Sequence, residues 1–546
     1  MSDSIAATTA AAADTVPAVR RADALSRPLV LGLLFAGAAL LSAITVLDGV
    51  QPNDEGLMLQ AASRIAHGQV PYSDFWWYYP PGQPYLLAGL WKVFGPSLLW
   101  WRVVRVIVDA TVAVLAYSLT RRRAPGLPAL AVWLVAACAM AFPSQPHPFP
   151  IALALSLGAL LAVERRPLLA GVLLGVCAAW RLEFAAYAGL GVAVAHALSA
   201  RPAGERIRRF GRVAGAAALT ALVLYLPVVM AAGLGRSWEM LVRYPLVDFG
   251  KYQSLPFPLH YRGPLNTTGP GGFLTDSAEN LIHFYLPLAL VIGLVGGLLA
   301  LAGRFRRDDP WPAATAVFAI GMGHYLVIRA DLFHTAPLAI MVSILAAGAL
   351  VREPLSIPAA ISPRLTGVVP RALATLAAAL GFAWALAEGV DRRIRGLTDE
   401  HTVALHLPAA DGVRARPQRA RALERAVDYI RNRVPPGRPI YVATQRSDLV
   451  TSGNPLLYVL AERPNATRYD IAAPGVVTSA PVQREIVRDL RRRRAFVVRF
   501  VAPITAVREP NRAGRSSGVR ILDAFLATDY RQVAKLGYYV MLEPRP

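Results

Sequence analysis

The sequence predicts a mainly α-helical protein, a polytopic membrane helix bundle of about eleven spans followed by a C-terminal extracytoplasmic α/β domain. Three observations lead to this prediction. Of the 546 residues, 55% are hydrophobic and 17% are charged, whereas about 25% are charged in ordinary soluble domains. Apolar stretches long enough to cross about 30 Å of hydrocarbon recur down to residue 387. Basic loops follow every second stretch.

The predicted spans are drawn from apolar length alone. They are residues 28–47, 98–119, 127–143, 148–164, 167–181, 184–199, 210–233, 282–303, 311–328, 333–351 and 367–387. The first lacks a small-residue cleavage site before Asp48, which indicates an uncleaved span rather than a signal peptide. Amphipathic stretches at 57–67 and 82–95 are expected to lie on the membrane surface.

The arginine distribution tests this topology independently, because short cytoplasmic loops carry the positive excess. The basic loops contain Arg121–Arg123, Arg165–Arg166, Arg201 to Arg212, Arg304–Arg307 and Arg352 to Arg364. They alternate with less basic loops, so the N-terminus is predicted inside and the loop 48–97 outside. An odd number of spans then places the C-terminal part outside as well.

Three domains are predicted. Residues 1–26 form an Ala/Thr-rich tail that is expected to be disordered, residues 27–387 form the membrane domain, and residues 388–546 form the α/β domain. In that last part, short apolar runs at Ile440–Ala443, Phe496–Val501 and Tyr538–Leu542 predict strands. Amphipathic helices are predicted at 420–434, 481–494 and 519–528. No G-x-G-x-x-G follows a strand, so nucleotide binding has no support there.

The charge and the cysteines exclude other classes of protein. The net charge of +22 is almost entirely arginine, because lysine occurs only at Lys92, Lys251 and Lys535. The arginines follow the membrane topology, so no nucleic-acid partner is predicted. Cys138 and Cys177 both lie in apolar runs, which excludes a disulfide-stabilised secreted scaffold.

The first outer loop carries the strongest functional signal. Adjacent carboxylates, Asp54 and Glu55, follow the first span, and aromatic residues that include Tyr78 and Tyr79 follow them. A carboxylate at the membrane–water boundary could act as general base on an acceptor hydroxyl. The alternative is a turn-forming loop whose aromatic side chains form an interfacial belt.

A second candidate lies between two spans, in Arg329-Ala330-Asp331-Leu332-Phe333-His334. Arg329 could bind a phosphate through its planar fork, with Asp331 and His334 lining the same cavity. Alternatively, Asp331 caps the following helix and Arg329 snorkels to the interface.

Further ionisable residues lie at the ends of spans. Arg102, Arg105 and Asp109 share one helix face, where they could contact a phosphate or pair with one another inside the bundle. Arg181 and Glu183 flank another outer turn and leave the same two interpretations open. His260, beside the Gly/Pro-rich stretch 266–272, is a candidate for a mobile loop on the acceptor side.

A family resemblance is carried by motifs in roughly residues 28–110. In order, they are Asp54-Glu55-Gly56, Gly68-x-Val70-Pro71-Tyr72, Pro80-Pro81-Gly82, Phe94-Gly95 and Arg102. This series resembles the GT-C class of membrane glycosyltransferases, and it is most similar to the bacterial branch related to protein mannosyltransferases and the aminoarabinose transferase. Beyond residue 110 the resemblance is architectural.

The resemblance implies an inverting glycosyltransferase in the bacterial cytoplasmic (inner) membrane. It would move a sugar from a polyprenyl-phosphate donor to a glycan, lipid or protein acceptor on the external face, with Asp54 as base and Glu55 as its acidic neighbour. Arg329, Arg102 and Arg105 would bind the donor phosphate. A monophosphate leaving group makes a metal dispensable, although Asp54 and Glu55 could hold a divalent cation.

Two alternatives remain open from the sequence. An oligosaccharide ligase or polymerase of the same fold would use a diphosphate-linked donor. A polytopic transporter would show internal repeats and broken helices near the midplane. No repeat relates the two halves of this chain, and its ionisable residues cluster at the outer boundary.

Overall fold

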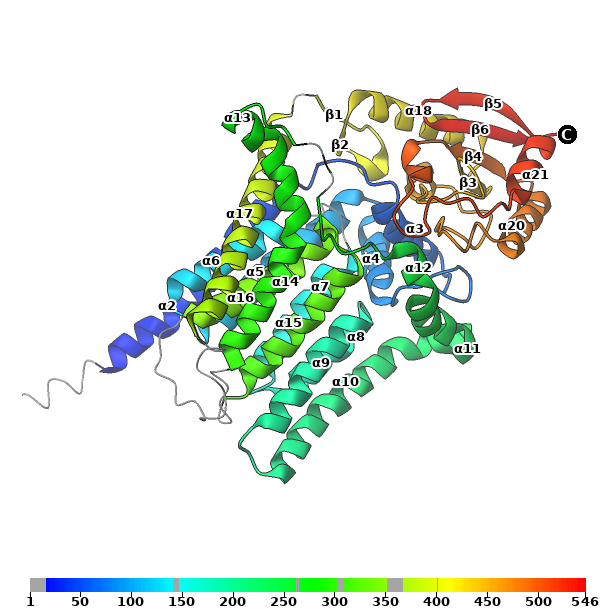
Figure 1. Cartoon of the computed structure of the whole chain (residues 1–546). Helices are drawn as coiled ribbons and strands as arrows, with labels where there is room; N and C mark the ends of the chain where they lie inside the picture. Colours follow the sequence, from blue (N-terminus) through cyan, green and yellow to red (C-terminus); the bar gives the residue numbers. More distant parts are fainter. Residues whose placement is uncertain are drawn as a thin grey trace, which may run out of the picture.

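The chain folds into a membrane helix bundle with an α/β domain on one end (Figure 1). The computed structural model describes residues 16–140, 147–261, 263, 265–302, 309–350, 367–399 and 401–546. Two basic loops of the predicted topology, Arg304–Arg307 and Arg352 to Arg364, lie outside the described residues, as does the first part of the predicted tail. The described remainder of that tail belongs to helix α2, which begins at Val16.

Within the described ranges, eleven apolar helices correspond one to one to the predicted spans. Six are long and apolar enough to cross a membrane, namely α5 (Leu98–Arg121), α10 (Ala203–Ala232), α14 (Glu279–Ala302), α15 (Trp311–Ile328), α16 (Leu332–Leu350) and α17 (Val368–Thr398). Five are shorter, namely the Pro28–Ala43 part of α2 (Val16–Ala43), α6 (Gly126–Met140), α7 (Pro148–Ala162), α8 (Pro167–Ala178) and α9 (Leu182–Leu198). The predicted multi-pass membrane architecture is confirmed.

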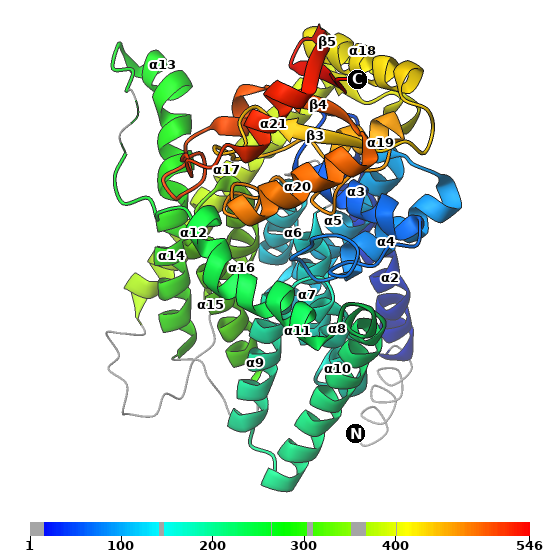
Figure 2. The same cartoon turned by 90° about the vertical axis from the view of Figure 1, so that its right-hand side faces the viewer.

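Small residues let the helices approach closely. On α8, a Cβ at Gly171 would lie 2.4 Å from the Val213 carbonyl oxygen of α10, and a Cβ at Gly175 would lie 2.5 Å from that of Ala217. This four-residue spacing of glycines is typical of packed membrane helices. Helix α10 therefore packs on α8, while most of its surface remains exposed along the edge of the bundle (Figure 2).

Two helices precede the second span. They are α3 (Asp54–Ala66) and α4 (Gly82–Phe94), and they cover the two stretches that were predicted to be amphipathic helices. The second long loop, between α10 and α14 and predicted to lie outside, is called the long outer loop. It contains α11 (Leu234–Trp238), the π-helix η1 (Glu239–Phe249), α12 (Gly250–Gln253), α13 (Pro270–Gly272) and the π-helix η2 (Phe273–Ala278). Helices α3, α4 and α12 lie beneath the C-terminal domain in both views (Figures 1 and 2).

The C-terminal domain is built on a four-stranded sheet in the order β3-β4-β6-β5. Its strands are β3 (Ile440–Thr444), β4 (Phe496–Phe500), β5 (Tyr530–Leu536) and β6 (Tyr539–Pro544). Strands β3 and β4 run parallel, with Ile440 opposite Phe496, and β6 is antiparallel to both β4 and β5. The three predicted strands are confirmed, and β5 is additional.

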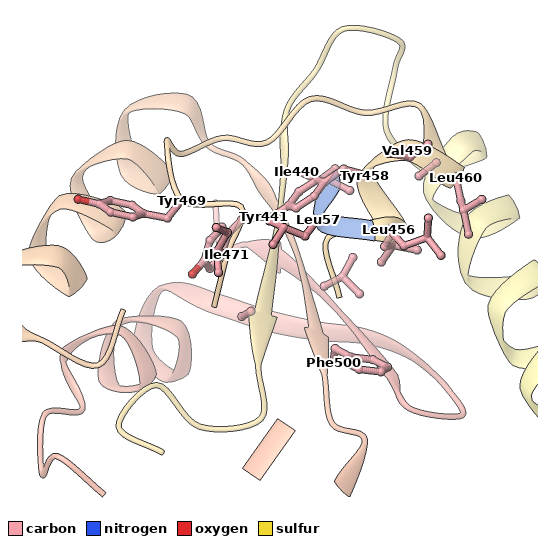
Figure 3. Packing of buried hydrophobic residues seen from close by; sticks show 14 of the residues in the cluster. Leu57, Ile440, Tyr441, Leu456, Tyr458, Val459, Leu460, Tyr469, Ile471 and Phe500 are labelled. Atoms are coloured by element: carbon pink, nitrogen blue, oxygen red, sulfur yellow. The ribbon is translucent and has the colours of Figure 1, made fainter. Parts of the chain in front are cut away.

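Helices and short elements complete this domain. They are α18 (Pro417–Arg433), α19 (Leu456–Ala461), α20 (Ala480–Arg493), α21 (Ile521–Asp529), the paired strands β1 (Val403–Ala404) and β2 (Arg414–Ala415), and the 3-10 helices η3 (Pro408–Ala410) and η4 (Pro503–Ala506). Its buried cluster also includes Leu57 of α3, which lies beside Leu456 and Tyr458 (Figure 3). The α/β domain thus shares one hydrophobic core with α3 and the loop that follows it, whereas most of the membrane bundle has a core of its own.

Polar contacts fix the start of α3 against this domain. The backbone N–H of Leu456 donates to the Pro52 carbonyl (3.3 Å), and that of Gly453 donates to the Asn53 side-chain oxygen (3.1 Å). At the other end of α3, Arg64 pairs with Asp470 at 2.5 Å with both side chains buried. The position of Asp54 is therefore set partly by residues four hundred positions away in the chain.

Gly56 is required where α3 meets α19, because a Cβ there would lie 2.3 Å from the backbone nitrogen of Leu456. We expect Gly56→Ala to force the two elements apart and to increase limited proteolysis between the membrane and α/β domains. Gly89→Ala on α4, where nothing lies within 4 Å of the added Cβ, is the matched control. Equal protease sensitivity of the two variants would contradict this expectation.

Candidate functional site

Asp54 begins helix α3 and is exposed to solvent. Its carboxylate accepts one hydrogen bond from the Asn53 side chain at 2.9 Å. Although Asp54 is accessible to solvent, the protein around it desolvates its carboxylate and so raises its pKa. The Asn53 bond and the charge of Arg329 lower this pKa, and the charge of Asp331 raises it further. A carboxylate with a raised pKa is a better base once ionised than an ordinary surface aspartate.

Glu55 points away from Asp54, because neighbouring residues on a helix do not face each other. It is buried and forms a two-pronged ion pair with Arg102 of α5, with Nε–Oε1 at 2.8 Å and Nη2–Oε2 at 2.9 Å. Both carboxylate oxygens are taken by the guanidinium, so Asp54 and Glu55 do not form a shared cation site. Among the described residues, no group of three or more His, Cys, Asp or Glu side chains is placed to hold a metal ion.

The guanidinium of Arg102 also closes the end of the first span. It donates to the carbonyls of Val46 (2.6 Å), Asp48 (3.4 Å) and Gly49 (2.7 Å). Together with Glu55, these acceptors use all five N–H donors of an arginine. Arg102 is therefore a structural clamp, and it presents no donor to a phosphate.

Arg105 lies one turn further into the bundle and is also buried. It donates to the Thr45 hydroxyl (3.0 Å) and the Ser42 carbonyl (3.0 Å), and its Nη1 lies 3.9 Å from the Asp109 carboxylate. This is the internal pair that the sequence left open as one of two interpretations. The structure does not bring Arg105 together with Asp54.

Arg329, Asp331 and His334 form one connected group at the junction of α15 and α16. Asp331 accepts Arg329 Nε (2.8 Å), the backbone N–H of His334 (3.0 Å) and His334 Nδ1 (2.6 Å). Asp331 therefore caps α16 and holds Arg329 at the same time. The capping interpretation is confirmed, and phosphate binding by Arg329 stays a prediction. Burial alone would raise the pKa of Asp331, but the bonds from His334 and the charge of Arg329 lower it overall.

A polar cluster lies at the end of the bundle that carries the α/β domain. Each member raises or lowers the pKa of at least one other member. They are Asp54, Tyr78, Tyr79, Arg181, Arg329 and Asp331, with His334 bound to Asp331. We call this group the Asp54 cluster. Four separate segments of the chain contribute to it.

Two predicted residues of the Asp54 cluster come from the first outer loop. The hydroxyl of Tyr78 donates to that of Tyr79 at 2.9 Å, and their rings are 4.2 Å apart. Tyr78 also packs against Tyr244 and Phe249 of η1, with ring centroids 5.4 Å away in both cases. The aromatic loop thus joins the first outer loop to the long one.

Arg181 lies in the turn before α9, and the structure places it in the Asp54 cluster beside Glu183. Its Nε lies 2.7 Å from Glu183 Oε1, and its guanidinium stacks over the Tyr325 ring at 5.3 Å. His260 differs. It is exposed in the long outer loop and is not among the groups that shift the pKa of Asp54.

Three residues near the Asp54 cluster were not predicted from the sequence. Gln253 accepts Arg329 Nη1 through its backbone carbonyl (2.6 Å), and Glu509 of the C-terminal domain lies 3.5 Å from Arg329 Nη2. His147, before α7, has a pKa held well below its usual value by burial and by the charges of Arg181 and His334. His147 carried a usable signal, because it is an ionisable residue at the outer end of a predicted span.

No protein-family model matches this chain, and no curated protein matches its sequence. Solved structures do. ArnT from Cupriavidus metallidurans bound to undecaprenyl phosphate aligns with a TM-score of 0.53 at 15% identity, over 93% of this chain and 97% of that chain. ArnT from the same organism in the apo state aligns with a TM-score of 0.52 at 15% identity, over 94% of this chain and 98% of that chain. AglB from Archaeoglobus fulgidus in complex with an inhibitory peptide and a dolichol-phosphate gives 0.46 at 14% identity, over 87% and 69%.

The agreement with ArnT extends over nearly the whole length of both chains, so it includes the membrane bundle and the C-terminal domain together. At this level of identity the likeness concerns the fold. The chain therefore has the GT-C fold of multi-pass membrane glycosyltransferases.

Proposed function

We propose that this protein is an inverting glycosyltransferase that moves a sugar from a polyprenyl-phosphate-linked donor to an acceptor hydroxyl. The observation that carries the proposal is the Asp54 cluster. It combines an exposed carboxylate of raised pKa with a nearby arginine, at the outer end of a membrane bundle. A lipid-borne sugar presents its anomeric carbon at that depth.

The two charges have complementary roles in this chemistry. Asp54 takes the proton from the acceptor hydroxyl as the hydroxyl oxygen attacks the anomeric carbon. The bond from that carbon to the phosphate oxygen breaks on the opposite side of the sugar, and Arg329 stabilises the charge that develops on the departing phosphate. A single displacement of this kind inverts the configuration.

The donor class is supported by the likeness to ArnT, whose structure is bound to undecaprenyl phosphate. We place the reaction on the external face of the bacterial inner membrane, because the arginine-rich loops predict that the opposite ends of the helices face the cytoplasm. Glycans, lipids and proteins all offer a suitable acceptor hydroxyl. The C-terminal domain packs directly on α3, and this contact supports a contribution of the domain to acceptor binding.

The proposal is tested by incubating the purified protein in detergent with a panel of polyprenyl-phosphate sugars and candidate acceptors. Release of free polyprenyl phosphate together with a product of inverted anomeric configuration is expected for one donor. Turnover of diphosphate-linked donors alone would instead indicate a ligase or polymerase. Movement of an intact substrate across sealed vesicles without bond cleavage would indicate a transporter.

The pH profile of transfer is expected to depend on the two charges beside the base. Activity should fall as the pH drops through the pKa of Asp54, because only the ionised carboxylate accepts a proton. The charge of Arg329 lowers this pKa and that of Asp331 raises it. Arg329→Gln should therefore move the acidic limb of kcat/KM to higher pH, and Asp331→Asn should move it to lower pH. The same acidic limb in the wild type and in both variants would contradict the assignment of Asp54 as the base.

A further inference from the structure

A loop of the C-terminal domain, residues 507–514, has a shape fixed by its own contacts. The backbone N–H of Glu509 donates to the Ala513 carbonyl (3.2 Å), and that of Ala513 donates to the Asn511 side-chain oxygen (2.7 Å). Gly514 has φ +67°, and a Cβ there would lie 2.1 Å from the Val507 carbonyl oxygen. The loop is therefore closed at its base, with Glu509 near its tip.

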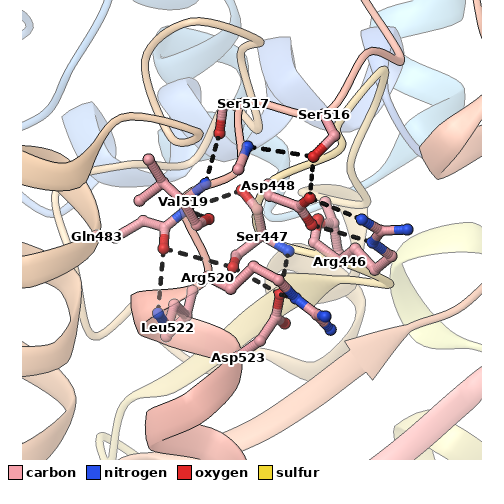
Figure 4. A network of polar contacts seen from close by, with 12 residues as sticks. Arg446, Ser447, Asp448, Gln483, Ser516, Ser517, Val519, Arg520, Leu522 and Asp523 are labelled. Carbon is pink, nitrogen blue, oxygen red and sulfur yellow. Dashed lines mark hydrogen bonds and ion pairs between the residues drawn. The ribbon is translucent and has the colours of Figure 1, made fainter.

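The base of the 507–514 loop is anchored in the α/β domain. The N–H of Gly514 donates to the Val450 carbonyl at 3.1 Å. The next residues join the polar network shown in Figure 4, where Ser516 donates to the Asp448 carboxylate. Asp448 is itself bound by Arg446 through two bonds, of 3.0 and 2.7 Å. The base of the loop is thus tied to the sheet domain.

The tip of the loop reaches the long outer loop and the Asp54 cluster. Asn511 Nδ2 donates to the Ser254 carbonyl (2.9 Å) and to Glu509 Oε2 (2.8 Å). The N–H of Arg512 donates to the Lys251 carbonyl (3.1 Å). The other oxygen of Glu509, Oε1, lies 3.5 Å from Arg329 Nη2.

This last contact is loose compared with the others that Arg329 makes. Its Nε donates to Asp331 at 2.8 Å, and its Nη1 donates to the Gln253 carbonyl at 2.6 Å. A well-formed bond between charged groups is about 2.7–2.9 Å long. Nη2 is therefore the part of the guanidinium whose present partner is most easily exchanged.

An incoming phosphate would meet a site already rich in negative charge. Asp54, Asp331 and Glu509 all lie near Arg329, and like charges brought together oppose binding. Asp54 is needed as the base and Asp331 caps α16, whereas Glu509 is held only through the loop. We propose that Glu509 occupies on Arg329 the position that the donor phosphate takes, and that the phosphate displaces it. This inference rests on the proposed function.

The displacement would couple the two halves of the protein. When the phosphate replaces Glu509 on Arg329, the 507–514 loop loses an ionic contact with the bundle. Donor binding thereby changes how the α/β domain is attached to the bundle. When the polyprenyl phosphate product leaves, Glu509 pairs with Arg329 again and helps to expel it.

Binding of a polyprenyl phosphate to the full chain in detergent tests this inference, with the matching polyprenol as the uncharged control. We expect Glu509→Gln to bind the phosphate about fivefold more tightly than wild type, in the range of a partly exposed ion pair, and to bind the polyprenol unchanged. Glu509→Asp, which keeps the carboxylate, should stay near wild type. The matched control is Glu543→Gln, because Glu543 also lies 3.5 Å from an arginine Nη2 in the same domain.

A double-mutant cycle separates the two levels of the proposal. In an Arg329→Gln background the effect of Glu509→Gln should disappear, because the two residues act through one contact. Equal or weaker phosphate binding by Glu509→Gln, or an unchanged effect without Arg329, overturns the displacement while leaving the proposed function intact. Wild-type phosphate binding by Arg329→Gln itself overturns the role of Arg329 in the proposed function.

Discussion

Asp54→Asn is expected to lower glycosyl transfer by about 10²–10⁴-fold, the usual contribution of a general base, without lowering thermal stability. The pKa of Asp54 is raised in the folded state, so at neutral pH the ionised carboxylate is less favourable in the fold than in the unfolded chain. That cost is present above the folded-state pKa and vanishes below the unfolded one. Asparagine removes the charge and keeps the shape.

The measurement pairs a transfer assay with a thermal unfolding curve in detergent. Asp411→Asn, an exposed aspartate of the C-terminal domain, is the control and should change neither quantity. Substantial transfer by Asp54→Asn would remove the proposed base. A large fall in its melting temperature would show instead that Asp54 is structural.

Glu55→Gln, one position further along, is expected to lower the stability of the fold, whereas Asp54→Asn is expected to lower only the transfer activity. It leaves the guanidinium of Arg102 buried without its counter-ion, and breaking a buried ion pair typically costs about 3–5 kcal/mol. We expect a large fall in melting temperature and poor expression. Any activity should be lost together with the fold rather than before it.

The matched comparison is the Arg209–Glu205 pair on α10. It has the same Nε–Oε1 separation of 2.8 Å, but both side chains are about 30% exposed. Glu205→Gln should therefore cost no more than about 1 kcal/mol. Similar melting temperatures for the Glu55 and Glu205 variants would contradict the clamp that Arg102 forms.

The spans were predictable from the sequence because crossing hydrocarbon is a local requirement on length and polarity. The strands β3, β4 and β6 were predictable because each is a short apolar run. Strand β5 was not predicted, since it is an edge strand in which exposed residues such as Arg531 and Lys535 interrupt the apolar pattern. Its place in the sheet depends on pairing with β6.

The candidate site was predictable only in part. The expected surface helix began at residue 57, whereas α3 begins at Asp54. That difference of three residues places both carboxylates in the first helical turn and turns Glu55 toward Arg102. The contact with Glu509 joins positions 180 residues apart, and no local pattern predicts such a pairing. The role of Asp54 stays a prediction until it is tested.

The docking of α19 on the start of α3 has a consequence for the order of biosynthesis. The outer loop is among the first segments to leave the ribosome, yet the residues that hold it, Gly453 and Leu456, are translated some four hundred codons later. The nascent chain is therefore inserted while the segment around Asp54 is not yet held in place. That segment reaches its final position only when roughly the last sixth of the polypeptide has been made and has folded against it.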